Sequence, residues 1–334
     1  RKAGFKVGLI GTINIMIEDE IEVSHNTTPD VVDLERSLYK MQQAGCDYVV
    51  MEVSSHALAL NRVAGCEYDV AVLTNITQDH LDFHETFENY RKAKALLFES
   101  LHTGNKTDKC AIFNMDDQSS EIIIKSTKSP IMTYGKAETN DVYPLFWKIE
   151  AKHMQLDLQT PAGELHLLLH ITGEFNVYNV MAAVSAMIAE KINLKVIEDT
   201  LNGFAGVPGR FQLVEAGQPY TVIVDYAHTP DGLENVLKTA RCITKGKLWV
   251  VFGCGGDRDS KKRPIMAKIA LELADNIVVT SDNPRSEDPE LIIADIEKGL
   301  VGATADKEIH KVTDRREAIN LALSKAEPND VILI

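Results

Sequence analysis

The alternation of short apolar runs with amphipathic helical segments constrains the fold more than any other feature of the sequence. Runs such as "YVVM", "VAVL" and "LWVVF" are rich in β-branched residues and are bounded by polar residues. The segments between them have the apolar spacing of helices that cover a sheet on one side. Strands buried on both faces and separated by helices are typical of βαβ units in a parallel sheet. The sequence therefore predicts an α/β protein.

This alternation occurs in two stretches of the chain, which predicts two doubly wound domains. In residues 1–208 the expected strands lie at 6–12, 47–54, 69–77 and 110–117, and the expected helices at 30–44, 87–100, 176–190 and 196–204. In residues 209–334 the expected strands lie at 220–227, 247–256, 276–284 and 330–334, and helices are expected from Pro230, Arg263, Pro289 and Asp314. The Gly- and Pro-containing segment "GVPGRF" marks the boundary between the domains.

Residues 146–170 have a different pattern, in which apolar and polar residues alternate on both sides of a "TPAGE" turn. This alternation predicts a small antiparallel sheet with one face exposed to solvent. The chain opens with residues 1–4 in the pattern of a helix end, and it stops within an expected strand. We therefore expect it to be a piece of a longer enzyme.

The composition disfavours several classes of protein. The net charge of -14 and the wide spread of the 35 Lys and Arg residues argue against a nucleic-acid-binding surface, which needs concentrated positive charge. The apolar runs are too short to cross a membrane. Five widely spaced cysteines give neither a disulfide framework nor a C-x-x-C metal motif, as expected of a protein from the reducing cytoplasm.

Polar side chains follow the predicted strands, and ligands of open α/β sheets bind outside the carboxyl ends of strands. Five strand ends carry carboxylates, imidazoles or arginines, in segments 52–56, 76–80, 225–228, 253–258 and 281–290. Each alone could be a helix cap or a turn, but together they predict a polar cleft between the domains. Glu52 and His80 are candidate ligands of a divalent cation such as Mg²⁺. The alternative for His80 is a helix cap or a backbone hydrogen bond.

Several motifs occur in the order that is typical of one enzyme family. They are "HNTTPD", "MEVSSHAL", "TNITQDHLDFH", "YRKAKALLF", "GEFNVYN", "VPGRF", "DYAHTPDGL", "FGCGGDRDSKKRP" and "DNPRSEDP". The chain resembles the Mur ligases, ATP-dependent amide ligases that build the peptidoglycan stem peptide, and most of all the member that adds the third amino acid. The resemblance implies that ATP phosphorylates a substrate carboxylate, an amine attacks the acyl phosphate, and phosphate leaves.

The resemblance also assigns catalytic and metal-binding residues. Glu52 and His80 resemble the Mg²⁺ ligands of the family. Lys94 resembles its carbamylated lysine, whose carbamate supports a second Mg²⁺. A free lysine would repel the cation, whereas the carbamate supplies an anion. The alternative for Lys94 is an exposed helix lysine such as Lys92.

Two further sets of residues match substrate-binding positions of the family. The first set is expected to bind UDP-MurNAc-L-Ala-D-Glu and comprises Asn26, Thr27, Thr28, Ser54 and Arg62. The second set is expected to bind ATP and comprises Asn176, Asn179, Arg210, Asp225 and His228. Leu60 departs from the pattern, because relatives often carry a glutamine there. A capped helix start is the alternative for "NTTPD" and for the two asparagines, and a plain strand end is the alternative for Asp225.

One loop indicates which amino acid is added. Family members that add meso-diaminopimelate carry "DNPR", and the four residues here are Asp282, Asn283, Pro284 and Arg285. A planar guanidinium can bind the distal carboxylate of diaminopimelate with two hydrogen bonds, and lysine has no such group. Arg258 matches the second arginine contact of the family. The alternatives are a simple strand-ending turn for "DNPR" and a surface salt bridge with Asp257 or Asp259 for Arg258.

The chain contains no G-x-x-x-x-G-K-[ST] loop, although the family carries a related phosphate-binding loop. We therefore expect this chain to be inactive by itself. The resemblance implies a bacterial cytoplasmic monomer that uses ATP and Mg²⁺. The alternatives are a lysine-adding ligase, another ligase of the superfamily such as folylpolyglutamate synthase, and a non-catalytic relative that binds nucleotide sugars or protein partners.

Overall fold

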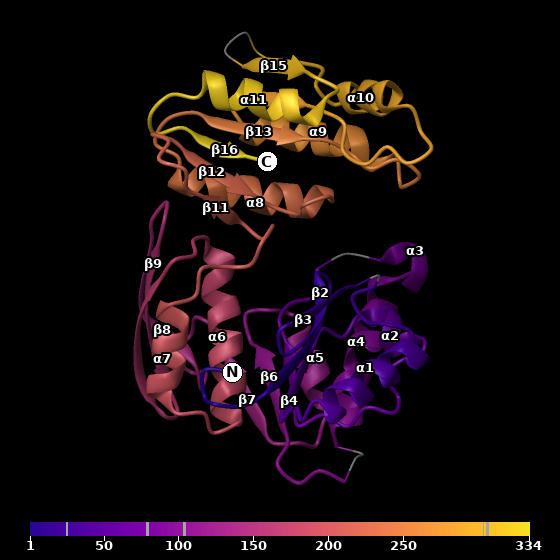
Figure 1. Cartoon of the computed structure of the whole chain (residues 1–334), viewed down its shortest axis with the longest axis vertical. Coiled ribbons are helices and arrows are strands. Elements are labelled where there is room, and N and C mark those ends of the chain that lie inside the picture. The colour runs from indigo at the N-terminus through magenta and orange to yellow at the C-terminus, as the bar shows by residue number, and fades with distance from the viewer. Residues whose placement is uncertain (25, 78–79, 103–104, 303, 305–306) are drawn as a thin grey trace. The chain divides into compact units, whose positions relative to one another are not determined.

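The computed structural model of the chain describes residues 1–334 except 25, 78–79, 103–104, 303 and 305–306. The chain forms two compact units (Figure 1). The first contains Arg1–Phe146, Leu156–Leu167 and Val177–Leu201, and the second contains Trp147–Gln155, Leu168–Asn176 and Asn202–Ile334. Both units combine helices with parallel strand pairs, which confirms the predicted α/β class. The domain boundary between residues 208 and 209 stays a prediction.

The first sheet of the first unit has the strand order β3-β2-β1-β4. Its strands are β1 (Val7–Ile10), β2 (Asn14–Ile17), β3 (Glu20–Val23) and β4 (Tyr48–Met51). β1 pairs in parallel with β4 and antiparallel with β2, which pairs antiparallel with β3. The β2–β3 hairpin is missing from the sequence-based prediction because its turn lacks the Asn-Gly or Asp-Gly signal of such turns. Glu18 in this turn nevertheless adopts a left-handed φ of 55°.

Helix α1 (Val31–Gln43) packs closely against this sheet. Met41 of α1 is buried in one cluster with Ile10 of β1. A Cβ at Gly8 would lie 2.4 Å from the sulfur of Met41, so the absence of a side chain at Gly8 permits this close approach. The short helix α2 (Ser55–Ala59) follows β4 and contributes to the same core.

Strand β4 lies at the end of its sheet and carries uncovered apolar side chains. Val49 is 41 % exposed and Val50 is 51 % exposed. Successive residues of a strand point to opposite faces of the sheet. Both faces of β4 are therefore partly open to solvent.

The second sheet of the first unit is parallel throughout. Its strands are β5 (Val70–Leu73), β6 (Cys110–Asn114) and β7 (Ile131–Tyr134), in that order. Helix α4 (Phe87–Leu101) packs on it, and the ring of Phe98 stacks on Phe113 at a centroid distance of 4.6 Å. The short helices α3 (Leu81–His84), α5 (Ser120–Ile123) and η1 (Ile124–Ser126) complete this region. The parallel strands predicted for the first domain are thus divided between two sheets.

Three strands form the small sheet that was expected near residues 146–170. They are β8 (Tyr143–Ile149), β9 (Met154–Thr160) and β10 (Gly163–Leu169), followed by the predicted helices as α6 (Glu174–Ala189) and α7 (Leu194–Asn202). The connection from β9 to β10 is too short to join parallel strands, so this pair is antiparallel. Met154, Leu156 and Leu158 are buried and the residues between them are more exposed, which confirms the predicted alternation.

The second unit is built on a sheet of order β11-β12-β16-β13-β14-β15. Its strands are β11 (Gln212–Val214), β12 (Thr221–Val224), β13 (Leu248–Phe252), β14 (Asn276–Val279), β15 (Glu308–Lys311) and β16 (Val331–Leu333). Neighbouring strands pair in parallel except β11 and β12, which are antiparallel. The helices of this unit are α8 (Pro230–Ile243), α9 (Lys262–Leu273), α10 (Pro289–Glu297) and α11 (Arg315–Lys325).

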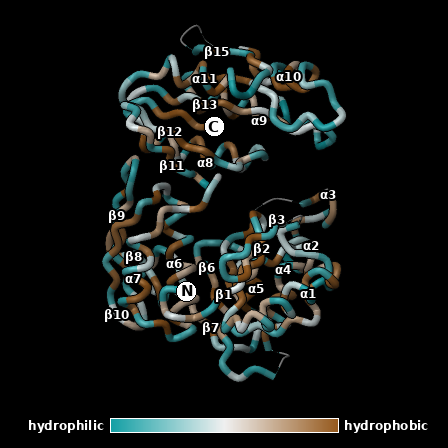
Figure 2. The backbone as a smooth tube through the Cα atoms, in the orientation of Figure 1, coloured by the Kyte–Doolittle hydropathy of each residue, from teal (hydrophilic) through white to brown (hydrophobic). Residues whose placement is uncertain are grey.

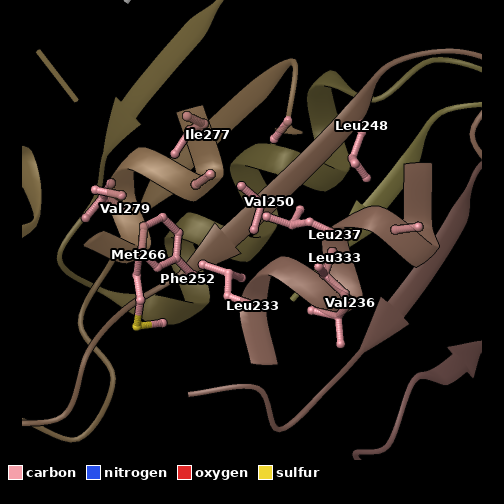
Figure 3. Close-up of a cluster of buried hydrophobic side chains, with 14 of the residues drawn as sticks. Leu233, Val236, Leu237, Leu248, Val250, Phe252, Met266, Ile277, Val279 and Leu333 are labelled. Carbon is pink, nitrogen blue, oxygen red and sulfur yellow. The ribbon is translucent and has the colours of Figure 1, made fainter. Parts of the chain in front are cut away.

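Helices cover both faces of this sheet. Val250 of β13 belongs to a buried cluster with Leu237 of α8 and Met266 of α9, part of which is drawn in Figure 3. Val251, the next residue of β13, packs on the other face with Ala318 of α11. Figure 2 shows hydrophobic residues along β13, as expected of a strand buried on both sides. The doubly wound arrangement predicted for the second domain is confirmed.

Local signals explain where the helices of the second unit begin. The side chains of Thr229, Asp288 and Asp314 accept hydrogen bonds from the first turns of α8, α10 and α11. Pro230 and Pro289 stand at the first helical positions, where a proline costs no hydrogen bond. The starts predicted for these four helices are confirmed within a residue.

Some parts of the sequence-based prediction are wrong or incomplete. Residues 1–4 form a turn closed by a hydrogen bond from the Gly4 N–H to the Arg1 carbonyl, where the end of a helix was expected. Strands β7, β11 and β15 were not predicted. β15 is mostly polar and partly exposed, so it lacks the apolar signal of the buried strands. Among the described helices, none is long and apolar enough to span a membrane.

Leu237→Ala is expected to lower the free energy of unfolding by about 2–5 kcal/mol, because truncation of a buried leucine leaves a cavity. Leu291→Ala is the matched control, since Leu291 of α10 is 65 % exposed. It should cost less than about 0.5 kcal/mol. Urea denaturation followed by tryptophan fluorescence reports on this unit, because Trp147 and Trp249 both lie in it. Equal losses in the two variants would contradict the burial.

Candidate active site

Glu52 follows β4 and is held by Thr12, which follows β1. The backbone N–H of Thr12 donates to Oε2 of Glu52 at 3.2 Å, and the Thr12 hydroxyl donates to the same oxygen at 2.5 Å. The hydroxyls of Thr12 and Thr27 lie 3.1 Å apart. On the other side, a Cβ at Gly11 would approach Oε1 of Glu52 to 3.0 Å. Glu52 is therefore an exposed carboxylate with one oxygen anchored.

The chemistry of this carboxylate suits Mg²⁺. This ion usually takes one or two carboxylates and completes its coordination with water and phosphate oxygens. Within the described ranges, no group of three or more His, Cys, Asp or Glu side chains is placed to hold a metal ion. Glu52 therefore fits an ion whose remaining ligands include water and substrate phosphate oxygens.

Thr28 connects the predicted UDP-substrate residues to the strand end that carries Glu52. Thr28 is 1 % exposed. Its hydroxyl donates to the Glu52 carbonyl at 2.8 Å and accepts from the Ser54 N–H at 2.9 Å. Nη1 of Arg62 donates to the Thr28 carbonyl at 3.4 Å, and its Nε pairs with Asp30 at 3.0 Å. The structure thus brings Thr28, Ser54 and Arg62 together. The Thr28 hydroxyl bonds to the backbone groups of Glu52 and Ser54.

The other predicted residues of this set lie around the same segment. Thr27 contacts Thr12 beside Glu52. Asn26 is exposed, and its carbonyl accepts a hydrogen bond from the Ser24 hydroxyl at 2.6 Å. The Ser54 hydroxyl also accepts from the Ala57 N–H at 3.2 Å and caps α2. Ser54 is therefore a helix cap that lies near Glu52. Leu60 ends α2 and is exposed.

His80 lies in a cluster of rings at the start of α3. It adopts a left-handed φ of 55°, which is uncommon outside glycine. Its ring centroid lies 4.8 Å from that of His56 and 6.1 Å from that of Tyr90. His84 is buried in the same cluster, with Nε2 2.9 Å from the Ser55 hydroxyl. Gln78 and Asp79, which precede His80 in the same motif, lie outside the described residues.

Lys94 contacts the ring that His80 also contacts. Its Nζ lies 6.0 Å from the Tyr90 centroid, and the spacing of four residues along α4 places both side chains on one face of the helix. Lys94 is partly buried, whereas Lys92 is exposed and pairs with Glu88 at 3.5 Å. Lys94 is therefore less exposed than Lys92 and, like His80, lies near the Tyr90 ring, and its catalytic role stays a prediction.

Three of the predicted ATP-binding residues gather at the carboxyl end of β12. The guanidinium of Arg210 lies 4.4 Å from the ring centroid of Tyr226, and the rings of Tyr226 and His228 are 5.0 Å apart. The carboxylate of Asp225 accepts from the N–H groups of Phe211 at 2.7 Å and Ala227 at 2.8 Å. Asp225 therefore fixes the backbone on both sides of this cluster.

The two predicted asparagines lie on α6. The side chain of Asn176 donates to the Thr172 carbonyl at 2.7 Å, near the start of the helix. Asn179 stands three residues further on and is exposed, so the two share a helix face. The bond of Asn176 to the preceding loop agrees with the alternative in which it stabilises the helix start.

The predicted diaminopimelate residues lie on two loops that pack backbone against backbone. One loop follows β13 and the other follows β14. The Gly256 N–H donates to the Asn283 carbonyl at 2.9 Å, and Nη1 of Arg285 donates to the Gly256 carbonyl at 2.6 Å. A Cβ at Gly256 would lie 1.9 Å from the Pro284 oxygen. Arg285 itself adopts a left-handed φ of 50°.

Arg258 stands on the first of these loops. Its Nη1 donates to the Asp257 carbonyl at 3.3 Å. In the part of the chain that the structure describes, neither Arg258 nor Arg285 forms an ion pair with a carboxylate. The surface salt bridge considered for Arg258 is therefore not found. Asp282 and Asn283 are exposed beside them and Pro284 is partly buried.

Asp257 joins the two loops. The N–H and hydroxyl of Ser286 donate to its carboxylate at 3.1 and 2.7 Å. These hydrogen bonds hold the pKa of Asp257 below its ordinary value, and the charges of Arg285 and Arg258 act in the same direction. The positive charges of both arginines thus act on the same carboxylate.

Sequence reasoning missed three residues that organise the site. They are Thr12, Tyr226 and Arg263. Thr12 is the last residue of the predicted strand at 6–12, so the rule that ligands bind at the carboxyl ends of strands would have found it. Tyr226 stands inside a motif between two predicted residues. Arg263, which is buried and paired with Glu287 and Asp295, gave no local signal because its partners lie on a distant segment.

The sequence matches the Mur ligase middle domain over residues 2–187 and the Mur ligase glutamate ligase domain over residues 209–334. These matches cover more than half of the chain. The chain belongs to the Mur ligase family.

Several curated proteins of this family are similar over the whole chain. The UDP-N-acetylmuramoyl-L-alanyl-D-glutamate--2,6-diaminopimelate ligase of Bacillus licheniformis is 49 % identical over 336 residues, which are 100 % of this chain and 68 % of the relative. The protein of the same name from Listeria monocytogenes is 46 % identical over 338 residues, with the same coverage of 100 % and 68 %. This chain thus corresponds to about two thirds of such relatives.

Solved structures show the same likeness. A structure with the name of this ligase matches with a TM-score of 0.70 at 35 % identity, covering 99 % of this chain and 67 % of its own. Folylpolyglutamate synthase of Thermotoga maritima matches with a TM-score of 0.71 at 18 % identity, covering 99 % of this chain and 80 % of its own. The second likeness concerns the fold alone.

Glu287→Gln is expected to destabilise the second unit at neutral pH and to make little difference in acid. Hydrogen bonds from Arg263 and from the Asp257 N–H lower the pKa of Glu287 below its ordinary value of 4.5. The stability from this carboxylate is therefore full above that value and is lost as the pH falls through the lowered pKa. The measurement is urea denaturation of both proteins at neutral pH and at a series of decreasing pH values that extends well below 4.5, because the lowered pKa lies below that value.

Glu272→Gln is the control for this experiment. Glu272 lies on the exposed side of α9, 3.9 Å from Lys268. Its replacement should change the stability little at either pH, because exposed ion pairs contribute little. A loss for Glu287→Gln of equal size at both pH values would show that the charge of Glu287 is not what stabilises the fold.

Proposed function

We propose that the protein is an ATP-dependent acid–amino-acid ligase that joins meso-diaminopimelate to UDP-MurNAc-L-Ala-D-Glu in peptidoglycan precursor synthesis, in the bacterial cytoplasm. Relatives named for this reaction are 46–49 % identical over the whole chain. The observation that supports diaminopimelate as the added amino acid is the pair of interlocked loops with Arg258 and Arg285. Guanidinium groups without carboxylate partners among the described residues suit an anionic group of a ligand.

The chemistry of the two candidate amino acids decides between them. Diaminopimelate carries a carboxylate beside its distal amine, and lysine ends in an amine alone. A cationic site would repel the ammonium group of lysine and attract the extra carboxylate of diaminopimelate. We assign Arg258 and Arg285 to this carboxylate, and the exposed turn of Asp282, Asn283 and Pro284 to the amino-acid site around it.

The reaction begins with phosphorylation of a substrate carboxylate by ATP, and the amine of the amino acid then displaces phosphate. When bound, Mg²⁺ supplies positive charge to the phosphate oxygens. We assign Glu52 and His80 to hold this ion, and Lys94, as its carbamate, to a second one. Thr12 orients Glu52 through two hydrogen bonds.

The remaining assignments follow the two sets predicted from the sequence. We assign the nucleotide-sugar substrate to Asn26, Thr27, Thr28, Ser54 and Arg62. We assign ATP to Asn176, Asn179, Arg210, Asp225 and His228. The contacts of Thr28 and Asp225 with backbone groups support an orienting role for these two. We further propose a monomer, with the domain boundary between residues 208 and 209.

The first prediction from this function concerns the amino acid. With UDP-MurNAc-L-Ala-D-Glu, the complete gene product is expected to release phosphate from ATP faster with meso-diaminopimelate than with L-lysine. The complete product is used because this chain corresponds to about two thirds of the relatives named for this reaction. Arg285→Lys should raise the KM for diaminopimelate by roughly 10- to 150-fold, the effect of losing a hydrogen bond to a charged group. A phosphate-release assay measures both, and equal rates with lysine would refute the specificity.

The second prediction concerns Thr12. Thr12→Val removes the hydroxyl that anchors Glu52 and keeps the shape of the side chain. The Mg²⁺ concentration for half-maximal activity should rise by roughly 10- to 100-fold, as expected when a group that orients a metal ligand is lost. Thr200→Val is the control, because the Thr200 hydroxyl bonds within α7, to the Val196 carbonyl at 2.6 Å. The same rise in both variants would rule out Glu52 as an ion ligand oriented by Thr12.

A further inference from the structure

Arg263 is a charged side chain that is almost completely buried in the second unit. It stands in the first turn of α9 and is 2 % exposed. Its Nη2 lies 2.8 and 2.9 Å from the two oxygens of Glu287, and its Nη1 lies 3.0 Å from Asp295. A buried charge is costly unless it is paired and hydrogen-bonded, and here two carboxylates meet one guanidinium.

The partners of Arg263 come from separate parts of the unit. Glu287 lies in the loop before α10, and Asp295 lies on α10. Nη2 of Arg263 also approaches the Gly255 carbonyl, in the loop after β13, at 3.5 Å. Only a planar guanidinium with several fixed donors reaches acceptors in these different directions. A lysine in the same place would offer one compact ammonium group.

The carboxylate of Glu287 extends this contact to the first arginine loop. Besides Arg263, it accepts the backbone N–H of Asp257 at 2.5 Å. Asp257 in turn binds the N–H and hydroxyl of Ser286. A continuous chain of hydrogen bonds therefore runs from Arg263 through Glu287 and Asp257 to Ser286. Its last two members stand directly beside Arg258 and Arg285 in the sequence.

The backbone at these points needs support. Asp257 has a φ of 52° and Arg285 has a φ of 50°, both in the left-handed region that non-glycine residues rarely occupy. Such conformations persist where the surrounding contacts determine them. The bond that Asp257 donates to Glu287 and the bond that it accepts from Ser286 hold the first conformation. The bond that Arg285 donates to the Gly256 carbonyl holds the second.

We propose that Arg263 is a positioning residue for amino-acid recognition. It does not contact the substrate, and it fixes the two loops so that the guanidiniums of Arg258 and Arg285 are presented to one carboxylate. The inference rests on the proposed function, in which these arginines bind the distal carboxylate of diaminopimelate. It adds a specificity-determining residue that lies beneath the site.

A positioning role and a merely structural role differ in their kinetics. Loss of folded protein lowers the apparent kcat and leaves each KM unchanged. Loss of loop geometry raises the KM for the amino acid alone. The test is therefore Arg263→Lys in the complete gene product, with diaminopimelate, ATP and UDP-MurNAc-L-Ala-D-Glu varied in turn. We expect the KM for diaminopimelate to rise about tenfold or more, and the other two to change less than about twofold.

A double variant tests whether Arg263 acts through the loops. Residues that act as a unit have non-additive effects. Arg263→Lys combined with Arg285→Lys should raise the KM for diaminopimelate little beyond Arg285→Lys alone. Glu287→Gln keeps the size of the side chain and disrupts the same chain of hydrogen bonds, so it should also raise the KM for diaminopimelate. It replaces Arg263→Lys in the test if that variant does not fold.

Arg241→Lys is the matched control. Arg241 is an arginine of the same unit that pairs with Asp275 at 2.9 Å and donates to the Leu273 carbonyl at 2.8 Å. It should leave the KM for diaminopimelate unchanged. A change below twofold for both Arg263→Lys and Glu287→Gln, additive effects with Arg285→Lys, or an equal rise in Arg241→Lys would each overturn the inference. Failure of the wild-type protein to use diaminopimelate would instead overturn the proposed function.

Discussion

The backbone of Gly256 approaches the carbonyl oxygen of Pro284 so closely that no side chain fits between them. Gly253 makes a similar approach, since a Cβ there would lie 2.4 Å from the Thr280 oxygen. These contacts join the loops after two neighbouring parallel strands into one rigid edge. The direction of Arg285 depends on this edge, because its side chain bonds to the Gly256 carbonyl. Recognition of a distal carboxylate, as proposed, therefore begins with two positions that exclude a side chain.

The parts of the fold that could be predicted are those with a local signal. The buried strands of the second unit are continuous apolar runs, and its helices begin at capping residues such as Thr229 and Asp288. The β2–β3 hairpin escaped prediction because Glu18 takes the left-handed conformation that glycine or asparagine usually signals. The division of the parallel strands of the first unit between two sheets escaped it as well, because periodicity identifies strands and does not say which strands pair.

The candidate site shows the same division between local and distant information. The places of Glu52 and Asp225 at strand ends could be predicted, because position along the chain implies position in the sheet. Their roles were less accessible. The carboxylate of Asp225 is used by backbone N–H groups, and the buried Thr28 hydroxyl bonds to backbone atoms. Arg263 could not be found in this way, because its hydrogen-bond partners lie 24 and 32 residues away in the sequence.

The open edge of β4 has a consequence for the behaviour of the chain in solution. Among the described strands, β4 pairs only with β1, and its other edge, which carries Val49 and Val50, forms a template to which another extended segment can add by hydrogen bonding. The net charge of -14 opposes the approach of a second copy. Salt screens this repulsion and leaves strand pairing largely intact. Colloidal stability of the chain is therefore an electrostatic property, and it should decrease as the ionic strength rises.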